Sequence, residues 1–141
     1  MALAITAASE ADEVATIALW QAAGLTRPWN DPAADFRLAL AGPASTVLLA
    51  RDGGAVVGSV MVGFDGHRGW VYYLAADPAR RGQGIGAALM AAAEDWLRAR
   101  DCPKIQLMVR TDNAAAKGFY AAIGYEEQAV TVIGRRLDGQ A

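Results

Sequence analysis

The run Arg81-Gly82-Gln83-Gly84-Ile85-Gly86 has the composition of a loop that binds phosphate. Its glycines would let backbone N–H groups approach an anion without interference from a Cβ atom. A helix is expected to begin inside this run, and it would add unpaired N–H groups and the positive end of its dipole. Arg80 and Arg81 would add charge-assisted donors. The pattern therefore predicts a pyrophosphate cradle, and the alternative is a glycine-rich connector that binds nothing.

Two other kinds of phosphate loop fit this chain poorly. A Walker A loop needs Gly-Lys followed by Ser or Thr, and the sequence has no such run. Gly82, Gly84 and Ala87 do match the dinucleotide-binding pattern, but that loop follows the first strand of its domain. Here hairpins are predicted before the loop, and the rest of the 141-residue chain is too short to complete such a parallel sheet.

The elements that would position this loop follow from apolar spacing and turn signals. Runs of apolar residues predict strands over 2–7, 46–50, 55–64, 70–76 and 104–110, with one or two more within 125–137. Helical spacing and capping signals predict helices over 9–23, 31–41, 85–100 and 113–123. In the first of these helices, Val14, Ile17 and Ala18 are expected to form the apolar face. The order of elements predicts an α/β fold class, a mixed α+β three-layer domain over residues 1–141.

Composition limits the function classes. The chain is 54% hydrophobic and 20% charged, with a net charge of -2, which is typical of a globular domain and predicts no nucleic-acid or membrane partner. One cysteine and one histidine exclude an intrachain disulfide and argue against a zinc site, so no metal is expected. We find no signal peptide or transmembrane pattern, and we expect a cytoplasmic location.

The loop and its surroundings together resemble the GNAT superfamily of N-acetyltransferases. Arg81-x-x-Gly84-x-Gly86 is similar to the family's Q/R-x-x-G-x-G/A loop, and it lies between a meander and a long helix, as in that family. A later helix begins at Asn113 and carries Tyr120, which also fits the family's order. Within the superfamily, the stretches 27–32, 65–69 and 102–106 resemble those of small bacterial YpeA-like acetyltransferases.

This resemblance implies a fold and a co-substrate. The fold would be GNAT-like, with a central, mostly antiparallel sheet of about 6–7 strands, a parallel splayed pair and about four helices. The co-substrate would be acetyl-CoA, with its pyrophosphate on Arg81–Gly86. The backbone of Leu74, Ala75 and Ala76 would pair with the pantetheine arm where the two parallel strands separate. Asn113 would hydrogen-bond the same arm, and Tyr120 would protonate the departing thiolate.

The reaction would be direct attack of a primary amine on acetyl-CoA in a ternary complex. An amine with a pKa of about 10 must lose a proton, and a thiol leaving group has a pKa of about 8.5, so a phenol is a reasonable proton donor. Some family members carry a glutamate base on the strand before the loop, but counting back places Trp70 there. The base is therefore left open among a water chain, Asp65 and His67.

The acceptor site is predicted from position alone. Trp29, Asn30, Tyr72 and Tyr73 would line it, because the cofactor would occupy the other side of the splayed strands. The acceptor is a small molecule or a protein amine, and the sequence does not distinguish them. A homodimer remains an alternative to a monomer. A further alternative is a binding module that senses CoA or acetyl-CoA without turnover.

Overall fold

The elements of the fold are given by a computed structural model that describes residues 3–139. In chain order they are β1 (Leu3–Ala7), the 3-10 turn Glu10–Asp12, α1 (Glu13–Ala22), α2 (Pro32–Ala41), β2 (Ser45–Asp52), β3 (Ala55–Phe64), β4 (Gly69–Ala76), the 3-10 turn Pro78–Arg80, α3 (Ile85–Arg98), β5 (Ile105–Gln106) and α4 (Ala114–Ala122). The chain forms two compact units, the first ending at Leu107 and the second beginning at Met108.

The first unit is built on one sheet with the strand order β1-β2-β3-β4-β5. Neighbouring strands from β1 to β4 are antiparallel, which confirms the predicted meander. β5 runs parallel to β4, with Gly69 opposite Ile105 and Trp70 opposite Gln106. The sheet is therefore mixed and mostly antiparallel, as predicted. Ala2, the first residue of the first predicted strand, lies outside the described residues.

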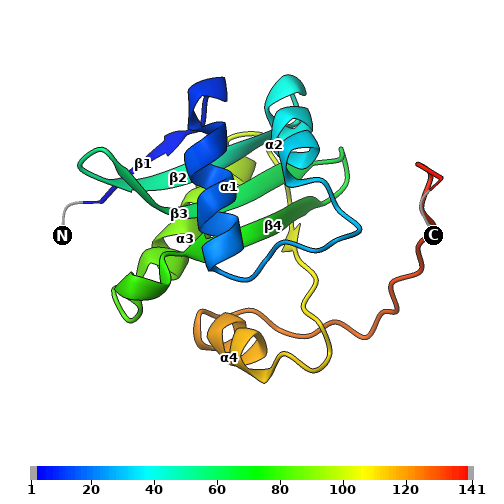
Figure 1. Cartoon of the computed structure of the whole chain (residues 1–141). Helices are drawn as coiled ribbons and strands as arrows, with labels where there is room; N and C mark the ends of the chain where they lie inside the picture. The colour runs from blue at the N-terminus through cyan, green and yellow to red at the C-terminus, as the bar shows by residue number, and fades with distance from the viewer. Residues whose placement is uncertain (1–2, 140–141) are drawn as a thin grey trace. The chain divides into compact units, whose positions relative to one another are not determined.

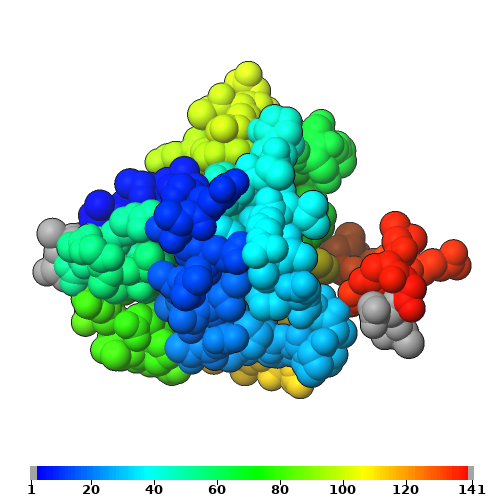
Figure 2. All heavy atoms as spheres, turned by 45° about the horizontal axis from the view of Figure 1, so that its top comes forward, coloured from blue at the N-terminus to red at the C-terminus, as the bar shows by residue number. Residues whose placement is uncertain are grey.

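Helices cover both faces of this sheet. Figure 1 shows α1 and α2 over one face and α3 over the opposite one. Figure 2 shows α1 and α2, drawn from blue to cyan, side by side at the surface of the first unit. Trp20, Phe36, Val47 and Leu49 are fully buried between these two helices and the sheet. On the other face, Leu89 and its helical neighbours bury the apolar side of α3.

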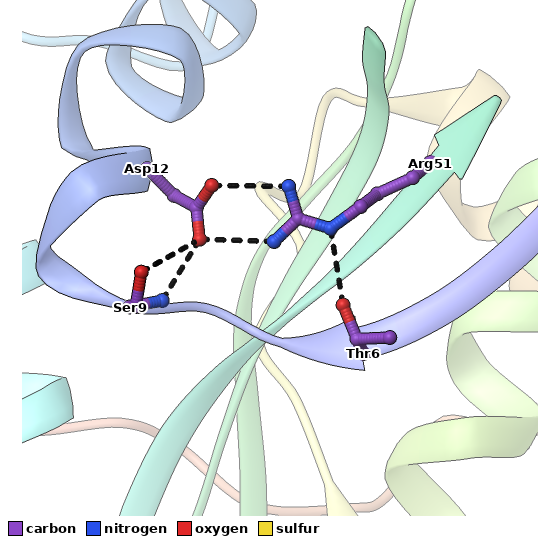
Figure 3. Close-up of polar contacts among 4 residues, drawn as sticks. All are labelled: Thr6, Ser9, Asp12 and Arg51. Carbon is purple, nitrogen blue, oxygen red and sulfur yellow. Dashed lines mark hydrogen bonds and ion pairs between the residues drawn. The ribbon is translucent and has the colours of Figure 1, made fainter. Parts of the chain in front are cut away.

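Local signals explain where the first two helices begin. Asp31 accepts hydrogen bonds from the N–H groups of Ala33 and Ala34, and Pro32 occupies the first turn of α2. Ser9 donates its backbone N–H to the Asp12 carboxylate at 2.8 Å. Asp12 also receives two hydrogen bonds from Arg51 of β2, at 3.0 and 2.9 Å, and Arg51 donates a further one to Thr6 of β1 (Figure 3). This cluster ties the entrance of α1 to two strands.

Three expectations from the sequence need correction. Among the described residues the sheet has five strands instead of 6–7, because 125–137 contains no strand. A strand needs a ladder partner as well as a suitable sequence, and no described residue pairs with 125–137 in a sheet. The strand predicted over 104–110 is reduced to the two residues of β5. In α1, the buried residues are Thr16, Leu19 and Trp20. Of the predicted apolar face, Ile17 is partly buried and packs against the core, but Val14 is 81% exposed and Ala18 is exposed as well.

Candidate functional site

The loop Arg81–Gly86, called here the glycine loop, connects the end of β4 to α3. Gly82 and Gly84 have φ angles of +77° and +76°, in the left-handed region that favours glycine, and a Cβ atom at either would meet nothing within 4 Å. Gly84 is the N-cap of α3, and because it has no side chain it cannot cap the first N–H groups of the helix. The first turn of α3 carries no acidic residue, so its N–H groups and dipole form a setting suited to an anion.

Two contacts hold the flanks of the glycine loop. Arg80 pairs with Asp52 at the end of β2, with 2.5 Å between nitrogen and oxygen. Ile85 is buried, and it packs where β3 has Gly58 in place of a larger residue. A Cβ atom on Gly58 would lie 2.5 Å from Ile85 Cγ2 and 2.8 Å from Leu89 Cδ1. The absence of a side chain at Gly58 therefore sets how closely the start of α3 approaches the sheet.

The edge of β4 beyond Trp70 is called here the open edge, because the pairing between β4 and β5 ends at Trp70 and Gln106. On the other side, Ala75 is opposite Ser59, and the N–H of Asp77 donates to the carbonyl of Val57 at 2.9 Å. Backbone groups alternate along a strand, so those of Ala75 face β3 while those of Leu74 and Ala76 face the open edge. Of the three residues predicted for the pantetheine arm, Leu74 and Ala76 therefore present backbone groups there, and Ala75 is buried.

A β-bulge interrupts the pairing of β4 with β3 within the stretch that bears the open edge. Ser59 pairs with Ala75 and Met61 with Tyr72, so Val60 alone lies opposite two residues of β4. Tyr73 has a φ of +52°, which is rare for a residue with a side chain. The Tyr73 carbonyl accepts a hydrogen bond from Ser59 Oγ at 2.9 Å, and Ser59 Oγ accepts one from Trp20 Nε1 at 2.8 Å.

The predicted acceptor residues lie in different surroundings within the first unit. Trp29 and Tyr72 are about half exposed, at 49% and 45%, and Asn30 is exposed in the turn before α2. The hydroxyl of Tyr73 donates to Asp35 at 2.6 Å, and its ring stacks on Trp20. Burial and the neighbouring Asp35 raise the pKa of Tyr73 far above its usual value. Tyr73 is therefore a fixed hydrogen-bond donor, while Trp29 and Tyr72 offer exposed aromatic surface.

Asn113 and Tyr120 belong to α4 of the second unit. Asn113 caps the helix, since its side-chain oxygen accepts from the N–H of Ala116 at 3.0 Å, as predicted for an N-cap. The ring of Tyr120 lies against Phe119 and Tyr125, with centroids 5.0 and 5.9 Å away. Burial raises the pKa of Tyr120. Their roles toward acetyl-CoA remain predictions.

The carboxylate of Asp65, one of the open choices for the base, is already engaged in its own turn. It accepts the N–H groups of His67 and Arg68 at 2.8 and 2.7 Å and, more weakly, Trp70 Nε1 at 3.3 Å. These donors, with the two backbone groups first, lower the pKa of Asp65. A carboxylate with a lowered pKa is a poor base for an ammonium group. The geometry therefore disfavours Asp65 in that role.

Sequence reasoning missed the residues that support the bulge. Trp20, Asp35 and Ser59 were not singled out, although Ser59 is a polar residue within an otherwise apolar strand. That isolated serine was the one available signal, because a buried hydroxyl usually has a specific partner.

Within residues 3–139 there is no group of three or more His, Cys, Asp or Glu side chains that could hold a metal ion. In the same part of the chain, no helix has the length and apolar character needed to cross a membrane.

Comparison with known proteins assigns the family. The model described as "Acetyltransferase (GNAT) family" matches residues 12–125, so the chain belongs to that family. An acetyltransferase of Yersinia enterocolitica is 46% identical over 129 residues, which cover 92% of this chain and 90% of that protein. This confirms the predicted class, an acetyltransferase of the GNAT type that uses an acyl-CoA.

Solved structures share the fold at low sequence identity. One is AAC(6')-Iy in complex with the bisubstrate analogue CoA-S-monomethyl-acetylneamine, with a TM-score of 0.83 and 16% identity over 96% of this chain and 99% of that one. Another is the ribosomal-protein-alanine N-acetyltransferase of Brucella melitensis biovar Abortus 2308, with a TM-score of 0.77 and 23% identity over 96% of this chain and 100% of that one. They confirm the predicted GNAT-like fold class.

Proposed function

We propose that this protein transfers the acetyl group of acetyl-CoA directly to a primary amine, with both substrates bound at once. The observation that carries the proposal is the continuity of the open edge of β4 with the glycine loop. Unpaired backbone groups at Leu74 and Ala76 lead, through the turn Pro78–Arg80, to the N-terminus of α3. Donors for an extended amide-bearing arm and for a pyrophosphate thus lie along one stretch of chain.

The residues of this stretch fit acetyl-CoA. Backbone N–H groups of the glycine loop would bind the pyrophosphate, and Gly82 and Gly84 leave open space where a Cβ atom would stand. The pantetheine arm contains amides, which can pair with Leu74 and Ala76 in the manner of an added strand. Asn113 would donate to the same arm while its side-chain oxygen caps α4. Acetyl-CoA supplies the activated acyl group, and the chain supplies position and proton transfer.

The chemistry then requires one donor, one acid and one base. The amine nitrogen forms a bond to the acyl carbon while the bond between that carbon and sulfur breaks, and the amine's proton leaves to a base. The Leu74 N–H, at the open edge, would stabilise the negative charge that develops on the acyl oxygen. Tyr120 would give its proton to the thiolate. With Asp65 disfavoured, a water chain and His67 remain as bases.

The acceptor site would lie around Trp29, Asn30, Tyr72 and Tyr73. Exposed aromatic surface at Trp29 and Tyr72 suits the apolar part of an amine, and amides or hydroxyls suit its polar part. One structural neighbour, AAC(6')-Iy, is in complex with a bisubstrate analogue made of CoA and acetylneamine, a small molecule. The other is named as an N-acetyltransferase of a ribosomal-protein alanine. Both acceptor classes therefore belong in one screen.

The proposal is tested first by calorimetry with CoA. Gly84→Asp places a side chain and a negative charge at the start of α3, so it should reduce CoA affinity at least about 100-fold, as expected when a charge-assisted anion site is opposed by a like charge. Gly24→Asp is the matched control, because Gly24 has a φ of +73° and equally open surroundings at the end of α1. Equal affinity for the two variants would show that the glycine loop is not the pyrophosphate site.

Turnover distinguishes an enzyme from a sensor. Release of free thiol from acetyl-CoA, with mass detection of the acetylated product, should occur with at least one member of a panel of small amines and peptides. Tight CoA binding without an acetylated product across such a panel would favour a CoA-sensing module over the proposed transferase.

A further inference from the structure

We propose that Ser59, oriented by Trp20, is a positioning residue that fixes the β-bulge at Tyr73 and thereby the Leu74 N–H at the open edge. The inference rests on the proposed function, because the direction of that N–H affects the reaction only if the acyl oxygen lies beside it.

The bulge needs support because its backbone conformation is unfavourable. Tyr73 has a φ of +52°, a conformation that a residue with a side chain keeps only where its surroundings enforce it. The bulge also interrupts the ladder to β3 between Ser59 and Met61. Ser59 Oγ donates to the Tyr73 carbonyl at 2.9 Å, so a side chain of β3 binds the carbonyl where the ladder is interrupted.

Trp20 determines which way the Ser59 hydroxyl points. The indole Nε1 can only donate, and it donates to Ser59 Oγ at 2.8 Å. The single hydrogen of the hydroxyl is then directed to Tyr73. Trp20 and Ser59 are both 0% exposed, so solvent water does not compete for these groups. The chain of two hydrogen bonds thus has one direction, from α1 through β3 to the bulge.

The same residue is held at two further points. The Tyr73 ring stacks on the Trp20 ring with 3.9 Å between centroids and 13° between planes. Its hydroxyl donates to Asp35 of α2 at 2.6 Å. Contacts to carbonyl, ring and hydroxyl leave Tyr73 little freedom, and Leu74 is the next residue along the chain. The position of its N–H therefore depends on this support.

The test compares removal of two buried hydroxyls. Ser59→Ala removes the donor to Tyr73, whereas Thr16→Val removes a fully buried hydroxyl of α1 that has no hydrogen-bond partner among residues 3–139. We expect kcat of Ser59→Ala to fall at least about 10-fold. The loss should be smaller than the roughly 10²–10³-fold that follows removal of an oxyanion donor itself. CoA lacks the thioester oxygen but pairs with Leu74 through its pantetheine arm, so the affinity for CoA should fall less than kcat. Thr16→Val should leave both quantities near wild type.

Ser59→Cys serves where Ser59→Ala fails to fold, because it nearly keeps the shape of the side chain and weakens both of its hydrogen bonds, to Tyr73 and from Trp20, without removing them. An intermediate kcat for this variant supports the inference.

A kcat for Ser59→Ala equal to wild type, or a loss of kcat no greater than that of Thr16→Val, would overturn the inference. If the wild-type protein neither binds CoA nor acetylates an amine, the proposed function has failed separately. The NMR shifts of the Leu74 amide and the Trp20 indole then decide the structural claim, and unchanged shifts in Ser59→Ala would refute it.

Discussion

Tyr120 is the residue for which protonation matters most in the proposed reaction. An acid must hold its proton until the thiolate departs, and burial raises the pKa of Tyr120, so the phenol stays protonated throughout the neutral range. Packing alone would also place a tyrosine between Phe119 and Tyr125. The acid role and the packing role therefore predict different results when only the hydroxyl is removed.

Tyr120→Phe keeps the ring contacts and removes the proton. For an acid we expect kcat to fall roughly 10²–10⁴-fold, the range of general acid–base groups, with CoA affinity nearly unchanged. Tyr125→Phe is the matched control, a tyrosine just past the end of the same helix that has no proposed part in the reaction. Steady-state kinetics and calorimetry on both variants provide the measurement. If both keep kcat within a few-fold of wild type, Tyr120 is a packing residue and another acid is needed.

At the scale of elements, the sequence predicted best where a local signal suffices. Asp31 followed by Pro32 predicted the start of α2, and two glycine-containing turns predicted the meander. The glycine loop was predicted at the junction of strand and helix, where the structure has it. Each of these signals acts within a few residues of its own position, which is why one sequence is enough to identify it.

The failures involve partners that are distant in sequence. Thr16 and Trp20 of α1 face the core of the first unit, although Val14 and Ala18 are more apolar than Thr16. The buried face of the helix depends on how the helix packs on the sheet, and its own sequence does not determine that packing. The bulge at Tyr73 depends on Ser59 and Trp20 from two other elements. No spacing within β4 indicates it. For the same reason, the direction of the Leu74 backbone could be predicted only as part of a resemblance.

The approach of α3 to the sheet gives a prediction for an element as a whole. Gly58→Ala would bring a Cβ atom against Ile85 and Leu89 and 3.2 Å from the Ala75 carbonyl, so these side chains must shift, and we expect the start of α3 to shift with them. Overpacking of this kind costs about 1–3 kcal/mol of unfolding free energy. CoA affinity should fall as well, because the glycine loop moves with the helix.

The control for this change is Gly54→Ala in the turn between β2 and β3, where a Cβ atom meets nothing within 4 Å. A second variant combines Gly58→Ala with Ile85→Ala, which removes the nearest of the contacted atoms and should recover part of the affinity. Denaturant unfolding and calorimetry measure the two effects. Unchanged CoA affinity in a destabilised Gly58→Ala protein would separate the position of α3 from ligand binding.

For the whole molecule, the family match is informative in a way that the individual elements are not. It covers residues 12–125 and so includes residues of both compact units. The Yersinia relative likewise aligns with 92% of the chain. The family match therefore includes both the glycine loop and α4, while the roles of Asn113 and Tyr120 stay predictions.

Stability against acid depends on the cluster of Figure 3, in which Arg51 binds Asp12 with two hydrogen bonds. Arg51 and the Ser9 N–H lower the pKa of Asp12 from 3.8 to about 2. A lowered folded-state pKa stabilises the protein above the unfolded value, and this stabilisation is lost as the pH falls from about 4 to about 2. Both side chains are less than a third exposed, at 24% and 16%, so solvent screening weakens the pair only in part.

We therefore expect Arg51→Met to lower the free energy of unfolding at pH 7 by about 1–2 kcal/mol and to reduce its dependence on pH between about 2 and 4. Arg37→Met is the matched control, since Arg37 binds Glu13 with the same two-bond geometry while its side chain is 69% exposed. An exposed pair contributes little because water screens it, so the control should lose less stability. Urea unfolding of the full chain across this pH range measures both variants. If Arg51→Met loses no more stability than Arg37→Met, and its acid transition matches that of wild type, the entrance of α1 is held by apolar packing and the Asp12–Arg51 pair contributes little.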